Sequence, residues 1–94
     1  MNDRELLELA AKAAGHALYL DWNPIVDNED ALTLAVKLHI NLTIESYEVC
    51  AGILSAPDTY KVLIKQKVSR NLPVLKATRR AIVRAAAQIG REMK

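Results

Sequence analysis

The sequence predicts an α+β fold: a small, mostly antiparallel sheet of about three strands packed with three helices, which cover one face of the sheet or both. Segments near both ends and one in the middle carry apolar residues at helical spacing. Shorter stretches, in which apolar and polar residues alternate, lie between them. The chain has 94 residues, of which 51% are hydrophobic and 26% charged. This balance predicts a single domain over residues 1–94 with one modest core.

The first two predicted elements are a helix over residues 3–14 and a strand over residues 17–22. Apolar side chains recur at helical spacing along the first segment, and Asn2 or Asp3 can cap its start. Along the second segment the side chains alternate with a period of two, as in a half-buried strand. Pro24 ends that strand, because it lacks a backbone donor.

A second helix is predicted from an N-cap at Asp27 to about residue 39, with acidic residues in its first turn. Leu32 and Val36 widen its apolar stripe, so we expect this helix to be well buried. The stripe itself consists of Ala31, Leu34, Ala35 and Leu38.

Two strands are predicted next, over residues 40–49 and 59–68, joined by a connection over residues 50–58. The alternation in the first strand slips near Ser46, which a β-bulge would explain. The two strands should form an antiparallel pair with one apolar face and one polar to basic face. The basic face carries Lys61, Lys65 and Lys67, which indicates that part of one side of the sheet is open.

The last predicted helix starts at residues 71–73, with Pro73 in its first turn, and runs to about residue 90. The predicted order of elements is therefore α-β-α-β-β-α. The apolar stripe of this helix consists of Leu75, Ile82, Ala86, Ile89 and Met93.

The sequence contains no motif for catalysis, and we expect no enzyme activity, no cofactor and no metal. The single cysteine, Cys50, excludes an internal disulfide framework, and neither His16 nor His39 has a partner at metal-ligand spacing. The three glycines form no phosphate-binding loop. Asp27, Glu29 and Asp30 could hold a divalent cation, but helix capping explains the same residues.

Charge and hydropathy limit the binding partners and the cellular location that we expect for the protein. A net charge of +2 is too small to indicate nucleic acid, so DNA binding is not expected. No apolar run approaches the roughly 18–20 residues of a membrane span, and the N-terminal residues do not resemble a signal peptide. We expect a protein of the cell interior.

Basic residues of the last helix are the most distinctive feature for binding. Lys76, Arg80, Arg84 and Arg91 fall on one face, and Arg79 lies beside it. Arginine binds phosphate in a bidentate manner, so Arg80 and Arg84 would contact phosphate. A solvated helix face is the alternative for this stripe. The remaining candidate residues are Trp22 or Tyr47, which could stack on a base, and Asn23 in the loop after Trp22. For Trp22 the alternative is a plug at the edge of the core.

Three blocks of the sequence resemble the phage ABA sandwich domain family of small bacteriophage and prophage proteins. The most specific block is the central one: Trp22-Asn23-Pro24, Asp27, Asp30-Ala31 and Leu34-Ala35-Val36-Lys37-Leu38. Residues 5–15 and 80–90 form the other two blocks, and together the blocks cover about half of the chain. The resemblance implies an α/β/α sandwich and a phage origin, and it implies no catalytic residue.

The resemblance and the basic stripe together predict a phage accessory protein that acts by binding in the host cytoplasm. In its most concrete form it is a homo-oligomeric anti-defence protein that sequesters a phosphorylated nucleotide signal of host immunity, of the cyclic or ADP-ribose type. The alternatives are an inhibitor that binds a host defence or regulatory protein, and a structural or assembly protein of the phage. An inhibitor would carry an exposed apolar patch with an aromatic anchor.

Overall fold

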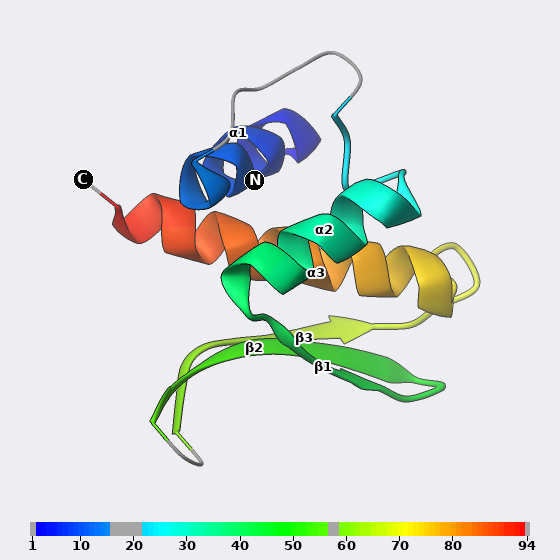
Figure 1. Ribbon diagram of the computed structural model, residues 1–94. Helices are drawn as coiled ribbons and strands as arrows, with labels where there is room; N and C mark the ends of the chain where they lie inside the picture. Colours follow the sequence, from blue (N-terminus) through cyan, green and yellow to red (C-terminus); the bar gives the residue numbers. More distant parts are fainter. Residues whose placement is uncertain (1, 16–21, 57–58, 94) are drawn as a thin grey trace.

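The computed structural model describes residues 2–15, 22–56 and 59–93, and for Ala56 the backbone only. It has the predicted α+β fold, with a three-stranded antiparallel sheet and three helices in the order α-α-β-β-β-α (Figure 1). The elements are α1 (Asp3–Ala14), α2 (Asn28–Leu38), β1 (Asn41–Ile44), β2 (Glu48–Ala56), β3 (Thr59–Lys67) and α3 (Val74–Glu92). Residues 17–21 of the strand expected over residues 17–22 lie outside the described residues.

The first two helices begin and end as their sequences predict. The side chain of Asn2 accepts a hydrogen bond from the backbone N–H of Glu5 at 2.9 Å, which caps α1. Asp27 caps α2 in the same way, through the N–H of Asp30 at 2.9 Å. A left-handed residue ends each helix: Gly15 after α1 (φ 63°) and His39 after α2 (φ 55°).

The segment after α2 is a β-hairpin, and two predictions for it were wrong. The slip near Ser46 is the hairpin turn, closed by the Glu45 N–H, which donates to the Glu48 carbonyl at 2.9 Å. The expected connection over residues 50–58 largely forms β2. Ala51 and Gly52 are poor strand formers by intrinsic preference, but here packing determines the conformation. Both residues are buried in β2, and a Cβ atom at Gly52 would lie 2.6 Å from the ring of Tyr60.

All three helices lie on one side of the sheet (Figure 1). Helix α3 contacts β2 and β3, while α1 and α2 pack against α3. Among the described residues no helix covers the other face, so the second helical layer expected of an α/β/α sandwich is not found there. That face carries Lys61, Lys65 and Lys67, all exposed, as the alternation of β3 predicted.

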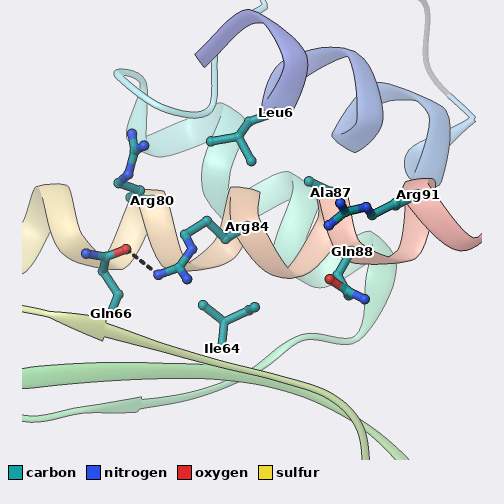
Figure 2. A pocket seen from close by; sticks show the side chains of 8 residues that line it. All are labelled: Leu6, Ile64, Gln66, Arg80, Arg84, Ala87, Gln88 and Arg91. Atoms are coloured by element: carbon teal, nitrogen blue, oxygen red, sulfur yellow. Dashed lines mark hydrogen bonds between the residues drawn. The ribbon is translucent and has the colours of Figure 1, made fainter. Parts of the chain in front are cut away.

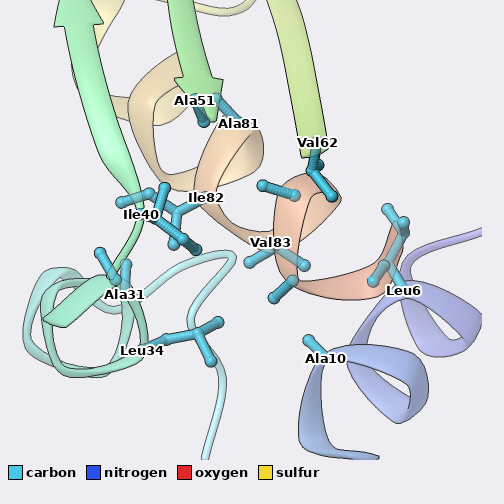
Figure 3. Packing of buried hydrophobic residues seen from close by; sticks show 14 of the residues in the cluster. Leu6, Ala10, Ala31, Leu34, Ile40, Ala51, Val62, Ala81, Ile82 and Val83 are labelled. Atoms are coloured by element: carbon cyan, nitrogen blue, oxygen red, sulfur yellow. The ribbon is translucent and has the colours of Figure 1, made fainter. Parts of the chain in front are cut away.

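The core is built around α3, which is buried on the side of the sheet and on the side of α1 (Figure 3). Small residues allow both layers to come close to this helix. Ala77, Ala81, Ala85 and Ala86 are each fully buried. Leu75 and Met93, which the sequence placed in the core stripe, are instead 58% and 42% exposed because they lie at the two ends of the helix, beyond the layers.

Helix α2 is less buried than its sequence predicts. Leu32 and Val36, expected to widen its buried face, are 62% and 67% exposed. Ala31, Leu34 and Ala35 do face the core, as predicted. The helix therefore packs along a narrow stripe and leaves a second apolar stripe uncovered.

Gly90 marks the closest approach between α1 and α3. A Cβ atom at this position would lie 2.8 Å from the carbonyl carbon of Leu9 and closer still to its oxygen. Backbone atoms within α1 cannot move aside without shifting the helix, so the contact requires glycine here.

Replacing this glycine tests the packing of the two helices. Intrinsic helix preference alone predicts that Gly90→Ala stabilises the protein by about 1 kcal/mol. The steric conflict with Leu9 predicts the opposite sign, a loss of about 1–3 kcal/mol, as for other overpacked sites. Urea denaturation measures the difference, with exposed Glu92→Ala as the control from the same turn. A stabilised Gly90→Ala variant would contradict this packing.

Arg79 ties the loop before α2 to α3. Only 9% of the residue is exposed, and its Nε and Nη1 atoms donate to the Ile25 carbonyl at 2.8 Å and the Asn28 side chain at 2.6 Å. The guanidinium group thus holds two successive parts of the entry to α2. Its contacts give Arg79 a structural role.

A substitution that keeps the charge tests the two hydrogen bonds of the Arg79 guanidinium. Arg79→Lys retains a cation but cannot reach both acceptors in the same geometry. Each lost hydrogen bond from a charged donor costs about 1.5–3 kcal/mol, so the denaturation midpoint should fall clearly. Arg4→Lys is the matched control, because the Arg4 side chain is 79% exposed. Equal midpoints for the two variants would show that Arg79 does not hold the loop.

Candidate functional site

A basic pocket lies between α1, α3 and β3 (Figure 2). Its volume is about 350 Å³, at the lower end of the range for small-molecule sites. Three arginines and two glutamines supply its polar groups, and aliphatic side chains form the rest of the wall. The lining residues are Leu6, Ile64, Gln66, Arg80, Arg84, Ala87, Gln88 and Arg91.

The spacing of residues along α3 creates this pocket. Arg80, Arg84, Ala87 and Arg91 lie within about 60° of one another around the helix axis, at about 100° per residue. The alanine of this stripe has a short side chain, which leaves space between the arginines on either side. Leu6 of α1 closes that space on one side, and Ile64 of β3 closes it on the other (Figure 2).

The arginines of the pocket differ in how firmly the protein holds them. Arg84 Nη1 donates to the side-chain oxygen of Gln66 at 2.7 Å and to the Lys65 carbonyl at 3.4 Å. Arg80 Nη1 forms an ion pair with Asp3 at 3.0 Å, in which the two side chains are 30% and 61% exposed. No hydrogen bond or ion pair of Arg91 is found within the described part of the chain.

Several donors of the pocket therefore remain available. The contacts of Arg80 and Arg84 all use one terminal nitrogen, Nη1. Their Nε and Nη2 atoms have no hydrogen-bond partner among residues 2–15, 22–56 and 59–93. An exposed ion pair such as Arg80–Asp3 contributes no more than about 1 kcal/mol, so an anionic ligand can displace Asp3.

Of the candidate residues predicted from sequence, the structure brings Arg80 and Arg84 together in the pocket and places the others elsewhere. Lys76 is exposed in the first turns of α3 and does not line the pocket. The Asn23 N–H donates to Asp30, and the Asn23 side chain accepts from the N–H of Ile25, so this residue shapes the loop before α2.

The two candidate aromatic platforms also lie outside the pocket. Trp22 is partly buried against the core, which fits the interpretation of a plug at the core edge. Tyr47 is 66% exposed in the β1–β2 turn. The carboxylate of Glu45 is the main cause that raises the pKa of Tyr47, with contributions from burial and from Glu48. These negative charges disfavour an anionic ligand at Tyr47.

The sequence did not identify the residues that α1 and β3 contribute to the pocket. Arg91 lies on the basic stripe but was not among the predicted site residues, and periodicity alone could have added it. Gln66 and Leu6 meet α3 only through the fold. No local pattern in the sequence could indicate that a β3 glutamine holds Arg84.

Among the described residues, the other titratable groups form no second catalytic or metal site. His16 lies outside the described residues, and His39 ends α2 in an exposed position. Within residues 2–15, 22–56 and 59–93, no three His, Cys, Asp or Glu side chains come together to hold a metal ion. No helix in the described part of the chain is long and apolar enough to cross a bilayer.

Cys50 is a half-buried free thiol with a raised pKa. Burial is the main cause that raises its pKa, followed by a hydrogen bond to the Glu48 carboxylate at 3.6 Å. Lys65 acts in the opposite direction, to a smaller extent. A raised pKa lowers the thiolate fraction at neutral pH, and the thiolate is the nucleophile.

The pH dependence of alkylation tests this description of Cys50. The raised pKa predicts that the iodoacetamide rate of the folded protein reaches half of its plateau at a higher pH than that of the urea-unfolded chain. The unfolded chain is the internal reference, since it contains the same single cysteine. A midpoint at or below that of the unfolded chain would contradict the raised pKa.

Comparisons with family models, with curated proteins and with solved structures find no match for this chain. The resemblance to the phage ABA sandwich family therefore stays a prediction.

Proposed function

We propose that the protein is a non-enzymatic binding protein that sequesters a small phosphorylated ligand in the pocket of Arg80, Arg84 and Arg91. The observation that carries this proposal is that three arginines line one cavity of about 350 Å³. Asp3 forms an ion pair with Arg80, and this one carboxylate beside three arginines leaves a net positive charge. A phosphate group would complete the site.

The hydrogen-bonding capacity of the arginines suits phosphate. Guanidinium groups donate two parallel N–H bonds to phosphate oxygens, which gives both affinity and orientation. Gln66 fixes Arg84 through Nη1 and leaves its other nitrogens for the ligand. Gln88 adds a neutral donor and acceptor at the same wall. Partly fixed donors of this kind lower the entropy lost on binding.

The composition of the pocket supports binding without turnover. Its described lining has no histidine, cysteine, serine or carboxylate, which are the usual bases and nucleophiles. Two nearby carboxylates are engaged with lining residues, Asp3 with Arg80 and Glu92 with Gln88. A bound phosphoester would therefore meet charge stabilisation but no positioned general base or nucleophile. This composition supports the sequestration of an intact ligand.

The walls of the pocket narrow the class of ligand. Leu6, Ile64 and Ala87 offer an aliphatic surface beside the arginines, which suits a ligand with one phosphorylated part and one less polar part. The planes of the guanidinium groups can stack on a base, a role first given to Trp22 or Tyr47. We propose a nucleotide of the cyclic or ADP-ribose type. Its role as a signal of host immunity rests on the resemblance to phage proteins.

Inhibition of a host protein is the second candidate function, favoured by an apolar patch on the open sheet face. Leu54, Tyr60 and Leu63 are each 45–47% exposed there. Leu54 pairs with Tyr60 across the strands, and the Tyr60 ring lies over Gly52, which pairs with Leu63. The patch thus has the aromatic anchor that such an inhibitor requires.

A thermal-shift screen against cyclic dinucleotides and trinucleotides, ADP-ribose, mononucleotides and pyrophosphate tests the proposed function. A ligand at 100 times its Kd adds about 2.7 kcal/mol of stability. For a domain of this size each kcal/mol raises Tm by roughly 4–8 °C. We expect one class of ligand to raise Tm selectively. We also expect to recover that ligand intact after the protein is denatured. No shift across the panel would overturn the pocket proposal in favour of the patch.

Three substitutions locate the binding of the ligand found by this screen. Arg84→Ala removes a charged donor pair and should weaken binding roughly 10- to 100-fold. Asp3→Asn should strengthen binding, because it removes the carboxylate that competes with the ligand for Arg80. Lys76→Ala is the matched control, a cation of the same helix outside the pocket, and should change Kd little. Equal losses for Arg84→Ala and Lys76→Ala would indicate diffuse attraction to a basic helix.

A further inference from the structure

The two free edges of the sheet differ in how they are protected. The edge of β3 carries three exposed lysines, and Arg84 of α3 donates to the backbone carbonyl of Lys65 at that edge. Such charges and contacts prevent an edge strand from pairing with another chain. The edge of β1 has no charged residue, since the strand reads Asn-Leu-Thr-Ile from Asn41 to Ile44. One edge is blocked and the other is left open.

The hydrogen bonding of the hairpin determines which β1 groups face outward. Because the Glu45 N–H donates to the Glu48 carbonyl, these residues form a hydrogen-bonded pair, and Thr43 forms the next such pair with β2. By the same alternation, Leu42 and Ile44 direct their N–H and C=O groups away from β2. Within the part of the chain that the structure describes, these backbone groups form a short row of donors and acceptors without a partner.

An apolar groove borders this open edge. It has a volume of about 430 Å³ and lies between α2 and β1, lined in part by Leu32, Val36 and Leu42. Leu32 and Val36 are the α2 residues that are 62% and 67% exposed, and Ile44 of the same strand is 54% exposed. Apolar side chains and unpaired strand groups therefore occur side by side on one face of the molecule, where α2 and β1 lie together (Figure 1).

We propose that this face is a homodimer interface in which β1 pairs antiparallel with β1 of a second copy, about a two-fold axis at Thr43. In this register Leu42 of each copy exchanges backbone hydrogen bonds with Ile44 of the other. The two threonines face each other as a pair without backbone bonds. The sheet becomes continuous across the dimer, and the inner-face side chains of both β1 strands form one apolar row beneath the two α2 helices.

The charges of α2 fit the same symmetry. The two-fold axis makes the two α2 helices antiparallel, and a crossing at Thr33 would place Glu29 of one copy opposite Lys37 of the other. All three residues are exposed. The apolar stripe of Leu32 and Val36 lies beside them, so each helix presents to its copy an apolar stripe and a complementary pair of charges.

A second copy suits this face better than an unrelated strand. An extended peptide would satisfy the backbone groups of Leu42 and Ile44, as in other strand-addition complexes. It would leave Leu32 and Val36 on α2 uncovered. A second copy brings its own α2 with the same two residues, and thereby covers the edge and the groove together. This interface lies on α2 and β1, whereas the arginine pocket lies between α1, α3 and β3.

The mass in solution tests the proposal. Light scattering after size exclusion, at micromolar concentration, should give twice the chain mass of 10.4 kDa for the wild type. Leu32→Glu should give the monomer mass, with an unchanged far-UV spectrum. Leu75→Glu is the matched control, since Leu75 is 58% exposed on α3, and should remain a dimer. A monomeric wild type, or a dimeric Leu32→Glu variant, would overturn the proposed interface.

Cysteine cross-linking tests the register. Antiparallel residues without backbone bonds have Cα atoms about 4.5 Å apart, within the reach of a disulfide. In a Cys50→Ser background, Thr43→Cys should therefore give a covalent dimer under mild copper-phenanthroline oxidation. Asn41→Cys is the control, because the two copies of this residue would lie about 13 Å apart. Equal cross-linking of the two variants, or none in Thr43→Cys, would contradict the register.

Discussion

The close packing of α1 on α3 at Gly90 is the constraint on which the rest of the structure depends. The small side chains of α3 allow α1 on one side and the sheet on the other to approach the same helix. With α3 enclosed in this way, a seam between the two layers stays open along the helix. The long side chains of Arg80, Arg84 and Arg91 come out at that seam. The pocket is therefore a consequence of how α3 is packed.

Local chemistry made the first two helices predictable, together with their caps. Asn2 and Asp27 act through side-chain hydrogen bonds within the same segment, and their consequences do not depend on the rest of the chain. The β-strands were harder to predict. The slip of the pattern at Ser46 signals a break in a strand, and a bulge and a hairpin turn produce the same slip. What distinguishes them is the strand that follows.

Strand β2 escaped prediction because its middle consists of small residues. Ala51 lies at 0% exposure beneath α3, and Gly52 lies under the ring of Tyr60. The small residue types at these two positions are required by neighbours that are remote in sequence or on another strand. Small residues also obscure the alternation of apolar and polar side chains that identifies a strand. The predicted burial of Leu32 and Val36 was wrong for a different reason: apolar character alone does not require that a residue be buried within its own chain. The proposed second copy accounts for that character.

The basic site was predictable as a stripe but not as a pocket. Arg80 and Arg84 share a face of α3 by periodicity alone, whereas Arg79, the direct neighbour of Arg80, is turned toward the α2 loop. Arg79 and Arg80 are therefore neighbours in sequence but make different contacts. Gln66, which holds Arg84, comes from another layer and could be found only from the fold.

The central claim is that the three arginines form one site for a phosphate group. A titration of isotope-labelled protein with pyrophosphate, followed by NMR, tests it most directly. The account predicts saturable shifts at the side-chain signals of Arg84, Gln66 and Gln88, with little change at the lysines of the open sheet face. Shifts that grow without saturation, or that affect Lys61, Lys65 and Lys67 as strongly, would contradict it.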